Sequence, residues 1–410
     1  MHSDFDAIII GGGPAGSTAA ILLAQAGWSV ALVEKQAFPR RKVCGECISA
    51  TNLPLLHALG IGAAFDALAG PELREVALFA GHASLLAPLP VFSEQHPWGR
   101  ALGREHLDTL LIARAAEAGA AVLQPCTVKR IERDGGLHVC HAVNADNDAA
   151  ILRAPVLIAA HGSWEPDPSS EDKHRPQRAS DLFAFKANFR NAQLAPGVLP
   201  VLAFSGGYGG IVLGDHGRTT LAFCIRRDAL RASRAKHAAR KAANAALAHV
   251  EASCAGVRDV LQGAELEAPW LSVGPIQPGI RAAWRDDGVF AIGNVAGEAH
   301  PILGEGMSMA IQSAWLLCER LVARGDLLRS DALLAGDRRI DRAHAEVGRD
   351  YAKAWRRSFA PRIRLASAFA HLAMRPRASA VLLPLLQLWP GLLTAGARAG
   401  GKVRRIIAIA

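Results

Sequence analysis

The stretch Asp6-Ala-Ile-Ile-Ile-Gly-Gly-Gly-Pro-Ala-Gly16 decides the fold of this chain. Its first half has the unbroken hydrophobicity of a buried parallel strand. Gly11, Gly13 and Gly16 then follow the G-x-G-x-x-G pattern. In this pattern the first glycine permits a tight turn, the second lets a pyrophosphate approach the backbone, and the third allows close helix–strand packing. We therefore predict a strand that ends at the glycines and a helix over residues 14–26.

A second strand and an acidic residue complete this unit. Ser29–Val33 is another short apolar run, and Glu34 follows it, 18 residues beyond Gly16. A carboxylate at the end of the second strand can accept hydrogen bonds from both hydroxyls of a ribose, while the helix N-terminus faces the phosphate charge. The sequence therefore predicts a βαβ unit that binds a dinucleotide.

A second glycine-rich turn lies near residue 300. The segment Gly293-Asn-Val-Ala-Gly-Glu-Ala-His-Pro-Ile-Leu-Gly-Glu-Gly-Met307 follows the apolar run Val289–Ile292 and opens a predicted helix over residues 305–323. Gly304 and Gly306 leave backbone N–H groups accessible to a ligand carbonyl. A helix N-terminus at this point stabilises negative charge on a bound ring system.

The middle of the chain has the pattern of an antiparallel sheet. The predicted strands, separated by Gly, Pro and Asp turns, are Leu182–Arg190, Leu199–Phe204, Tyr208–Leu213 and Arg218–Arg226. An Ala-rich helix is predicted over residues 235–254. The predicted fold is α/β, with a dinucleotide-binding domain in two parts (1–175 and 276–340), an inserted sheet domain for the substrate (176–275) and a basic helical C-terminal tail (341–410).

Composition restricts the class of protein. Half of the 410 residues are hydrophobic and a fifth are charged, which excludes a largely disordered chain. Seven cysteines, an odd number in a long chain, do not resemble a disulfide framework. The acidic start runs directly into the first strand without a secretory signal. We therefore expect a cytoplasmic protein.

The positive charge of the chain is concentrated in its tail. Residues 341–410 hold 13 Lys and Arg against three Asp and Glu, so they account for the whole net charge of +9. A basic segment that is also rich in Leu, Ala and Trp favours an anionic membrane surface over nucleic acid. We therefore expect peripheral contact of the tail with the inner face of the membrane and no nucleic-acid partner.

One tail segment allows three interpretations. Residues 378–397 contain no charged side chain over a length that could span a bilayer. Pro384, Pro390 and Gly391 interrupt the segment, and a broken helix in lipid leaves backbone groups unpaired. The alternatives are an apolar helix pair that caps the protein's own core, an interfacial membrane segment and a membrane span.

Together these motifs resemble those of the para-hydroxybenzoate hydroxylase superfamily of FAD-dependent oxidoreductases. The motifs that carry the resemblance are Gly11–Gly16 with Glu34, Arg104-x-x-Leu-Asp108, and Gly293-Asn294 followed by Pro301-x-x-Gly-Glu-Gly-Met307. Two further segments, Lys42-Val-Cys-Gly45 and Gly206-Gly-Tyr-Gly-Gly210, look most like the geranylgeranyl reductase branch. The resemblance implies a glutathione-reductase-like, three-layer FAD-binding domain with an inserted antiparallel sheet.

The resemblance also implies which residues bind FAD. They are Gly11, Gly13, Pro14, Ala15, Gly16, Glu34, Lys35, Arg104, Gly293, Asn294, Pro301, Gly304, Gly306 and Met307. Asn294 stands where the family has an aspartate, and its amide can still hydrogen-bond a hydroxyl. His161-Gly162 stands where hydroxylases that use NAD(P)H have Asp-Gly, so the electron donor, NADPH or NADH, stays open. The Trp-x-Trp-x-Ile-Pro signature of flavin halogenases is absent, which argues against halogenation.

Several side chains are candidates for chemistry. The resemblance places Cys44 beside the flavin, and Glu46 and His300 are further candidates for handling a proton. Tyr208 is expected to face the substrate from the inserted sheet. Cys44 and Cys47 also form a C-x-x-C pair, but no second Cys or His pair at suitable spacing completes a zinc site, so no metal is predicted. The pair is either a dithiol couple with thiol pKa values lowered by the neighbouring basic residues, or a loop that packs without chemistry.

Three functions fit these motifs. The first is an FAD-dependent oxidoreductase that passes a hydride between flavin N5 and a carbon of a lipophilic substrate, such as a polyprenyl, polyketide or acyl-derived compound. The second is a flavin monooxygenase that hydroxylates an aromatic substrate with NAD(P)H and O2. The third is a membrane-associated redox sensor that holds FAD without turnover.

Overall fold

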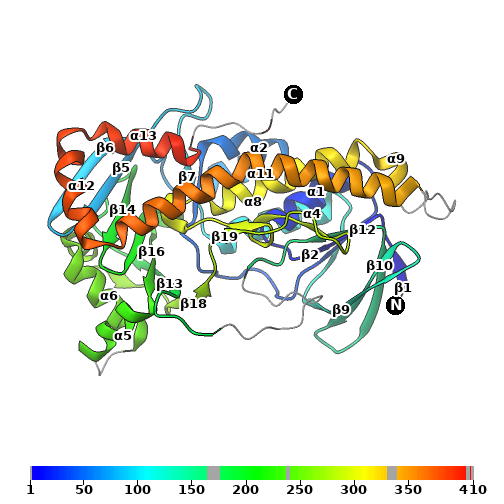
Figure 1. The fold of residues 1–410 in the computed structure, drawn as a ribbon, viewed down its shortest axis with the longest axis horizontal. Coiled ribbons are helices and arrows are strands. Elements are labelled where there is room, and N and C mark those ends of the chain that lie inside the picture. Colours follow the sequence, from blue (N-terminus) through cyan, green and yellow to red (C-terminus); the bar gives the residue numbers. More distant parts are fainter. Residues whose placement is uncertain (1, 164–175, 237–240, 330–338, 403–406, 408–410) are drawn as a thin grey trace.

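Two sheets lie at opposite ends of the molecule, and one long helix, α11 (Arg339–Ala373), runs across both (Figure 1). The computed structural model describes residues 2–163, 176–236, 241–329, 339–402 and 407. The sequence-derived architecture of an α/β cofactor domain, a second sheet and C-terminal helices is confirmed.

The first sheet is parallel and has the predicted strand–helix–strand unit at its centre. Its strands, in spatial order, are β20 (Phe290–Ala291), β12 (Val156–Ala159), β2 (Ala7–Ile10), β3 (Val30–Val33) and β8 (Ala121–Leu123). Every residue of β2, β3 and β12 is buried, as expected of strands covered on both faces. The helix between β2 and β3 is α1 (Pro14–Gln25), within one residue of the prediction.

Two different layers cover the faces of this sheet. Ile9 packs in the core formed with the helices α1, α4 (Arg104–Glu117) and α8 (Gly306–Val322). Ile8 packs in the opposite core, against a small sheet of β1 (His2–Asp4), β11 (Ala149–Ala154), β10 (Leu137–Asn144) and β9 (Cys126–Asp134). Successive residues of a strand point to opposite faces, so the unbroken apolar run of β2 serves both cores. The result is three layers.

The second sheet has eight strands and is mixed. Their bounds are β17 (Glu265–Leu266), β13 (Leu182–Arg190), β16 (Thr219–Arg226), β15 (Gly207–Leu213), β14 (Val198–Phe204), β5 (Glu75–Ala80) and β6 (Ala83–Pro88) in spatial order, with β18 (Leu271–Ile276) also paired to β13. All four predicted strands are present. β5 and β6 come from the region assigned to the first part of the cofactor domain, and β5 pairs with β14 in parallel.

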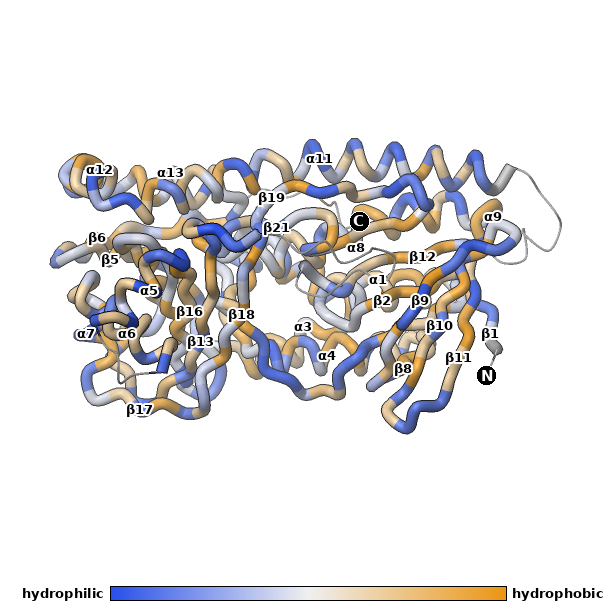
Figure 2. Tube along the Cα trace, turned by 60° about the horizontal axis from the view of Figure 1, so that its bottom comes forward, coloured by the Kyte–Doolittle hydropathy of each residue, from blue (hydrophilic) through white to orange (hydrophobic). Residues whose placement is uncertain are grey.

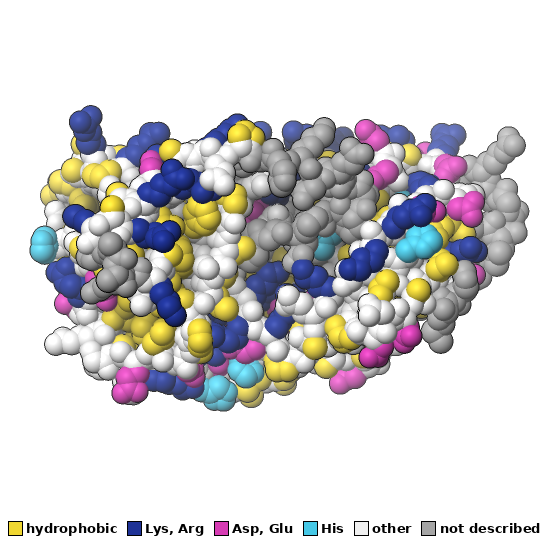
Figure 3. All heavy atoms as spheres, turned by 90° about the horizontal axis from the view of Figure 1, so that it is seen from below, with side chains coloured by type: hydrophobic (Ala, Val, Ile, Leu, Met, Phe, Trp, Pro, Cys, Tyr) yellow, Lys and Arg dark blue, Asp and Glu magenta, His cyan; other side chains and the backbone are white. Residues whose placement is uncertain are grey.

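Helices cover one face of this mixed sheet. Val250 of α6 (Ala242–Ser253) and Val257 of α7 (Ala255–Leu261) share a core with Phe185 and Phe223 of the sheet. The predicted single helix over residues 235–254 is wrong, because α5 (Arg227–Lys236) and α6 are separate and Lys241 has an extended backbone (ψ 152°) directly before α6. On the lower side of the molecule, hydrophobic side chains gather most in the half that carries the mixed sheet (Figure 3).

Short elements connect the two sheets. The paired strands are β4 (Cys47–Ile48) with β7 (Arg100–Ala101), and β19 (Gly279–Ile280) with β21 (Gly297–Glu298). The short helices are α2 (Leu53–Ala58), α3 (Gly62–Leu68) and α9 (Gly325–Leu328), with the 3₁₀ turns η1 (Ala50–Asn52), η2 (Asp215–Gly217), η3 (Gly293–Val295) and η4 (Pro301–Leu303).

The predicted tail is part of the core rather than an appendage. Tyr351, Trp355 and Phe359 of α11 are buried in the same core as α1 and α8, while the opposite side of the helix is polar (Figure 2). Beyond α11, α12 (Pro376–Leu388) and α13 (Gly391–Gly400) form what we call the tail helix pair. Of the helices that the structure describes, none could cross a membrane by itself. The tail helix pair meets the length and composition criteria only jointly, and it is bent by 111°.

The packing of α11 predicts that Trp355→Ala destabilises the protein by about 3–5 kcal/mol, the usual cost of a large buried aromatic. Trp355 is 2% exposed and packs against Phe359 in a tilted arrangement with ring centroids 5.5 Å apart. The matched control is Trp389→Ala, since Trp389 is 60% exposed and its loss is expected to change stability by less than about 0.5 kcal/mol. Urea unfolding of both variants measures the difference, and equal midpoints would contradict the packing of α11 on the core.

Candidate functional site

In the first glycine turn, Gly13 leaves room for a ligand, whereas Gly11 and Gly16 are in close contact with the protein itself. Gly11 has φ +109°, and a Cβ there would lie 2.6 Å from the Ala160 carbonyl oxygen. A Cβ on Gly16 would lie 1.8 Å from the carbonyl oxygen of Gly11. A Cβ on Gly13 would meet only the Arg104 guanidinium, at 3.7 Å. Gly11 and Gly16 are therefore required by the fold, whereas Gly13 keeps the backbone open toward a cavity.

Glu34 lies at the end of β3, as predicted, and is buried. Its Oε2 accepts a hydrogen bond from the Gly12 N–H at 2.8 Å, and its Oε1 accepts one from the Gln36 N–H at 2.9 Å. The carboxylate therefore fixes the glycine turn, and it also lines the cavity, where it can accept hydrogen bonds from ribose hydroxyls.

Positive charge gathers beside this turn. Arg40, Lys42 and Arg104 all line the cavity. Burial, together with the charges of Arg104 and Arg40, lowers the pKa of Lys42 to about 8. Arg104 is bonded through Nε and Nη2 to Asp108, at 2.6 Å each. Cations held this close together destabilise one another, so an anion such as a diphosphate fits between them.

The second glycine turn lines the same cavity and meets the first at Gly293, where a Cβ would lie 3.0 Å from the Ala15 Cβ. Gly293, Asn294, Pro301, Gly304 and Met307 all border it. Gly304 has φ +64°, which turns the chain from η4 into α8. The N-terminus of α8 therefore faces the cavity, where its N–H groups favour negative charge on a ligand. Among the predicted cofactor residues, only Gly16 and Lys35 do not line the cavity.

The cavity has a volume of about 590 Å³ and reaches from the glycine turns to the mixed sheet and the tail helix pair. Of the four side chains proposed for chemistry or substrate contact, Cys44, Glu46 and Tyr208 line it, whereas His300 does not and instead contacts the Tyr208 hydroxyl. Its far walls are aliphatic: Val76 and Leu78 of β5, Leu199 and Val201 of β14, Ile211 and Val212 of β15, and Leu382, Leu383 and Leu386 of α12. The site thus has a polar end and an apolar end.

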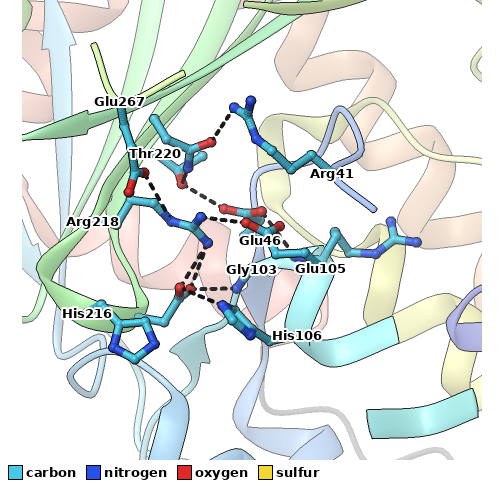
Figure 4. Close-up of polar contacts among 12 residues, drawn as sticks. Arg41, Glu46, Gly103, Glu105, His106, His216, Arg218, Thr220 and Glu267 are labelled. Carbon is cyan, nitrogen blue, oxygen red and sulfur yellow. Dashed lines mark hydrogen bonds and ion pairs between the residues drawn. The ribbon is translucent and has the colours of Figure 1, made fainter. Parts of the chain in front are cut away.

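Glu46 joins the two sheets at the edge of the cavity. Its carboxylate contacts the ammonium of the fully buried Lys186 from β13, accepts from the Thr220 hydroxyl of β16 at 2.6 Å, and accepts from the Arg104 N–H of α4 at 3.1 Å. Figure 4 shows Thr220 and Glu46 in this network, with Arg218, the residue before β16, directed at Glu105 of α4. Sequence analysis missed Lys186, because no local motif surrounds it.

Tyr208 and His300 form a buried pair. The Tyr208 hydroxyl and His300 Nδ1 are 2.8 Å apart. Burial, with a smaller contribution from His371, lowers the pKa of His300 to about 4, so its ring is neutral at pH 7. Burial also raises the pKa of the Tyr208 hydroxyl well above its usual value, so Tyr208 keeps its proton. The pair therefore brings a proton donor to the cavity wall.

The two glycine turns, the buried cations and the acidic residue after the second strand together fit a dinucleotide cofactor. The comparison with protein families identifies the same kind of cofactor. A family model described as "FAD binding domain" matches residues 4–349. The chain belongs to this FAD-binding family. It is an FAD-dependent oxidoreductase of the para-hydroxybenzoate hydroxylase type, and FAD is its cofactor.

Relatives of several activities share parts of the sequence or the fold. Menaquinone reductase of Mycobacterium tuberculosis is 32% identical over 162 residues, which are 39% of this chain and 38% of that protein. Digeranylgeranylglycerophospholipid reductase 2 of Methanopyrus kandleri is 34% identical over 160 residues, which are 39% and 38% of the two chains. The matched part thus spans about two fifths of these relatives. A myxobacterial chondrochloren halogenase has the same fold, with a TM-score of 0.75, 19% identity and coverage of 96% of this chain and 91% of its own.

A second residue cluster that sequence analysis missed holds the flavin-binding turn. Glu305, which is 2% exposed, accepts a hydrogen bond from the Ser49 hydroxyl. Lys402, beyond α13, places its Nζ 3.3 Å from Glu305 Oε1, and Arg362 of α11 lies 3.7 Å from Oε2. Lys402 also lines the FAD-binding cavity. The tail therefore supplies the cations that compensate a buried carboxylate within the turn.

The two cysteines of the C-x-x-C pair are not bridged to each other, and Cys47 is buried. Both cysteines are free thiols, and burial raises the pKa of Cys47 to about 12, opposite to the predicted lowering. Cys44 Sγ accepts from the Glu46 N–H at 3.4 Å. Within the described ranges, the only group with metal-ligand spacing is His106, Asp215 and His216. Because the Arg218 guanidinium already lies 2.9 Å from Asp215 Oδ2, we assign no metal to it.

The glycine geometry predicts that Gly13→Ala weakens FAD binding without unfolding the protein. Its φ of −72° suits alanine and the space is open, so the added methyl group meets the cofactor rather than the protein. We expect the Kd for FAD to rise about tenfold or more, equivalent to about 1.4 kcal/mol. FAD titration and thermal unfolding of the FAD-free protein measure both effects. Gly16→Ala is the contrasting variant, since it is expected to lower stability as well. Unchanged FAD affinity in Gly13→Ala would contradict the assignment.

The Glu305 cluster predicts that Lys402→Met weakens FAD binding by about fivefold, because loss of one partner of a buried carboxylate costs about 1 kcal/mol or more. Arg398→Met is the matched control: it removes an exposed cation from the same segment. FAD titration of both variants tests this. If both variants bind FAD like the wild type, Lys402 does not hold the turn.

Proposed function

We propose that this protein reduces or dehydrogenates a lipophilic small molecule of the polyprenyl, polyketide or acyl-derived class. The observation that carries this proposal is the single cavity that joins the FAD cradle to an aliphatic wall. Bound FAD supplies the hydride chemistry at N5, and the protein supplies position, exclusion of water and a proton. An extended apolar wall binds hydrocarbon by the hydrophobic effect, without requiring polar groups on the substrate.

The names of the sequence relatives support this substrate class. They are a menaquinone reductase and a digeranylgeranylglycerophospholipid reductase, which name a quinone and a phospholipid. The likeness to halogenases supports the fold alone, since the identity is below 20%. The mixed sheet contributes most of the aliphatic wall, so substrate choice depends on β5, β14 and β15.

Tyr208 is the proposed proton donor. Reduction of a carbon–carbon double bond adds a hydride to one carbon and a proton to the other. Tyr208 lines the cavity, stays protonated and is held by His300. When the hydroxyl proton passes to the substrate carbon, the neutral His300 ring, with its proton on Nδ1, donates a hydrogen bond to the phenolate oxygen that remains. His300 is therefore a positioning residue in this proposal.

Glu46 and Cys44 have other roles in this proposal. The Glu46 carboxylate already accepts from Lys186, Thr220 and the Arg104 backbone, so it anchors the loop rather than donating a proton. Cys44 shapes the cavity next to this anchor.

The proton-donor role predicts that Tyr208→Phe slows oxidation of the reduced enzyme by substrate about 10²–10⁴-fold, the usual contribution of general acid catalysis. Chemical reduction of the bound FAD is expected to be unaffected. Tyr351→Phe is the matched control, because Tyr351 is the other tyrosine of the chain, is also buried, and bonds only the Ala291 carbonyl oxygen, at 2.8 Å. Stopped-flow absorbance measures both variants. Equal substrate rates in wild type and Tyr208→Phe would remove Tyr208 from the mechanism.

The reaction type is tested by a visible spectrum of the FAD-loaded protein, titrated without oxygen with NADPH and then NADH. We expect the oxidised flavin bands to bleach and to return when a lipid-soluble unsaturated substrate is added. Return of the bands only in air, with oxygen uptake and a hydroxylated product, would establish the monooxygenase alternative. Bands that bleach with neither nicotinamide would require another electron donor, and bands that never respond to any substrate would favour a redox sensor.

A further inference from the structure

The exposed large hydrophobic side chains of the described residues gather at one end of the molecule. Six of the ten lie on or beside the tail helix pair: Leu372, Val381, Leu385, Leu388, Trp389 and Leu392. Two more lie on or just after β6, which contacts both α12 and α13. The Thr394 hydroxyl donates to the Pro88 carbonyl oxygen at 2.7 Å, which fixes α13 on β6. This clustering exceeds the scattered single residues that are normal on a protein surface.

Helix α12 is apolar on two sides. Leu382, Leu383 and Leu386 face inward and line the cavity. On the outer side, Val381 is 75% exposed and Leu388 is 73% exposed, and no residue of α12 is buried. A helix with apolar residues all round is expected where both of its sides meet apolar surroundings. The cavity supplies one such surrounding, and the outer side requires another.

The charges around the tail helix pair select the partner. Residues 351–410 contain 11 Lys and Arg and no Asp or Glu. Arg375 and Arg377 precede or begin α12, Arg398 lies in the last turn of α13, and all three are exposed. Cations that border an exposed apolar surface fit the headgroup region of an anionic bilayer, with Trp389 at the boundary between headgroups and acyl chains. The pair is bent by 111° and the Thr394 hydroxyl holds α13 on β6, which favours a pair that lies along the interface rather than across the membrane.

We propose that the tail helix pair docks in the interface of an anionic bilayer, and that α12 is the wall through which a lipid-soluble substrate passes from the membrane into the cavity. The docking rests on the exposed surface alone. The passage of substrate rests in addition on the proposed function. Leu385 of α12 and Leu392 of α13 line the cavity and are also exposed at the docked surface, so a hydrocarbon chain need not cross water.

Vesicle flotation of the full-length, FAD-loaded protein tests the docking. The probes are vesicles of mixed phosphatidylcholine and phosphatidylglycerol, against vesicles of phosphatidylcholine alone. We expect the wild type to float with the anionic vesicles and to lose binding as salt increases. The outer-face variant, Val381→Gln/Leu388→Gln/Trp389→Gln, is expected to reduce vesicle partitioning about tenfold or more, because three apolar side chains no longer enter the membrane. Arg375→Gln/Arg377→Gln/Arg398→Gln is expected to reduce binding to the anionic vesicles to a similar extent.

The matched control is Leu266→Gln/Val322→Gln, which removes the two exposed hydrophobic side chains that lie elsewhere on the described surface. The control is expected to float like the wild type. Wild type that stays with neither vesicle, or an outer-face variant that floats unchanged, would overturn the docking. A wild-type dimer in sedimentation that becomes a monomer in the outer-face variant, without flotation, would assign the surface to a second copy of the chain instead.

A quinone probe separates docking from catalysis. Oxidation of the reduced enzyme by menaquinone is measured with the quinone in anionic vesicles and in detergent micelles. We expect the outer-face variant to be slower about tenfold with vesicles and unchanged with micelles. Equal rates in vesicles for variant and wild type would overturn the passage through α12. No oxidation in either medium, with flotation intact, would count against menaquinone-like substrates and the passage but not against the docking.

Discussion

The buried carboxylate of Glu46 is the interaction on which the geometry of the cavity depends. Lys186 and Thr220 reach it from two strands of the mixed sheet, and the Arg104 N–H reaches it from a helix of the FAD domain. Glu46 itself has φ +61°, a strained conformation that persists only where its surroundings hold it. A buried ion pair specifies geometry more than it adds stability. Glu46 therefore ties β13 and β16 of the mixed sheet to α4 at the edge of the cavity.

The C-terminal helices take part in a second contact of this kind, in which a buried carboxylate joins distant segments of the chain. A buried carboxylate in the flavin-binding turn, Glu305, takes its cations from α11 and from the residue just beyond α13. The aromatic face of α11 packs into the core of the FAD domain, while its other end packs beside the mixed sheet. Because one chain segment completes both the flavin site and the apolar wall, the cofactor and the substrate region are mechanically joined.

The fold does not decide which flavin reaction the protein catalyses. The side chains that line the cavity restrict the choice of reaction. Reductases and a halogenase share parts of this sequence or its architecture. The FAD cradle is common to such activities because it recognises only the cofactor. In this chain the Tyr208–His300 pair borders a cavity whose far wall is aliphatic, and the proposed hydride and proton transfer rests on that arrangement.

The sequence by itself determined the strand–helix–strand unit with the first glycine turn, because its requirements are local. They are a residue without a Cβ at position 16, an acidic residue after the second strand, and two buried strands joined by one helix. Four of the eight strands of the mixed sheet could be predicted from their local pattern as well. Tertiary structure alone decided which distant residues meet. Lys186, Lys402 and β5 carry no local signal, since their partners lie far along the chain and burial creates the need for them. The separation of α5 from α6 carries no local signal either, because an Ala-rich segment favours helix throughout.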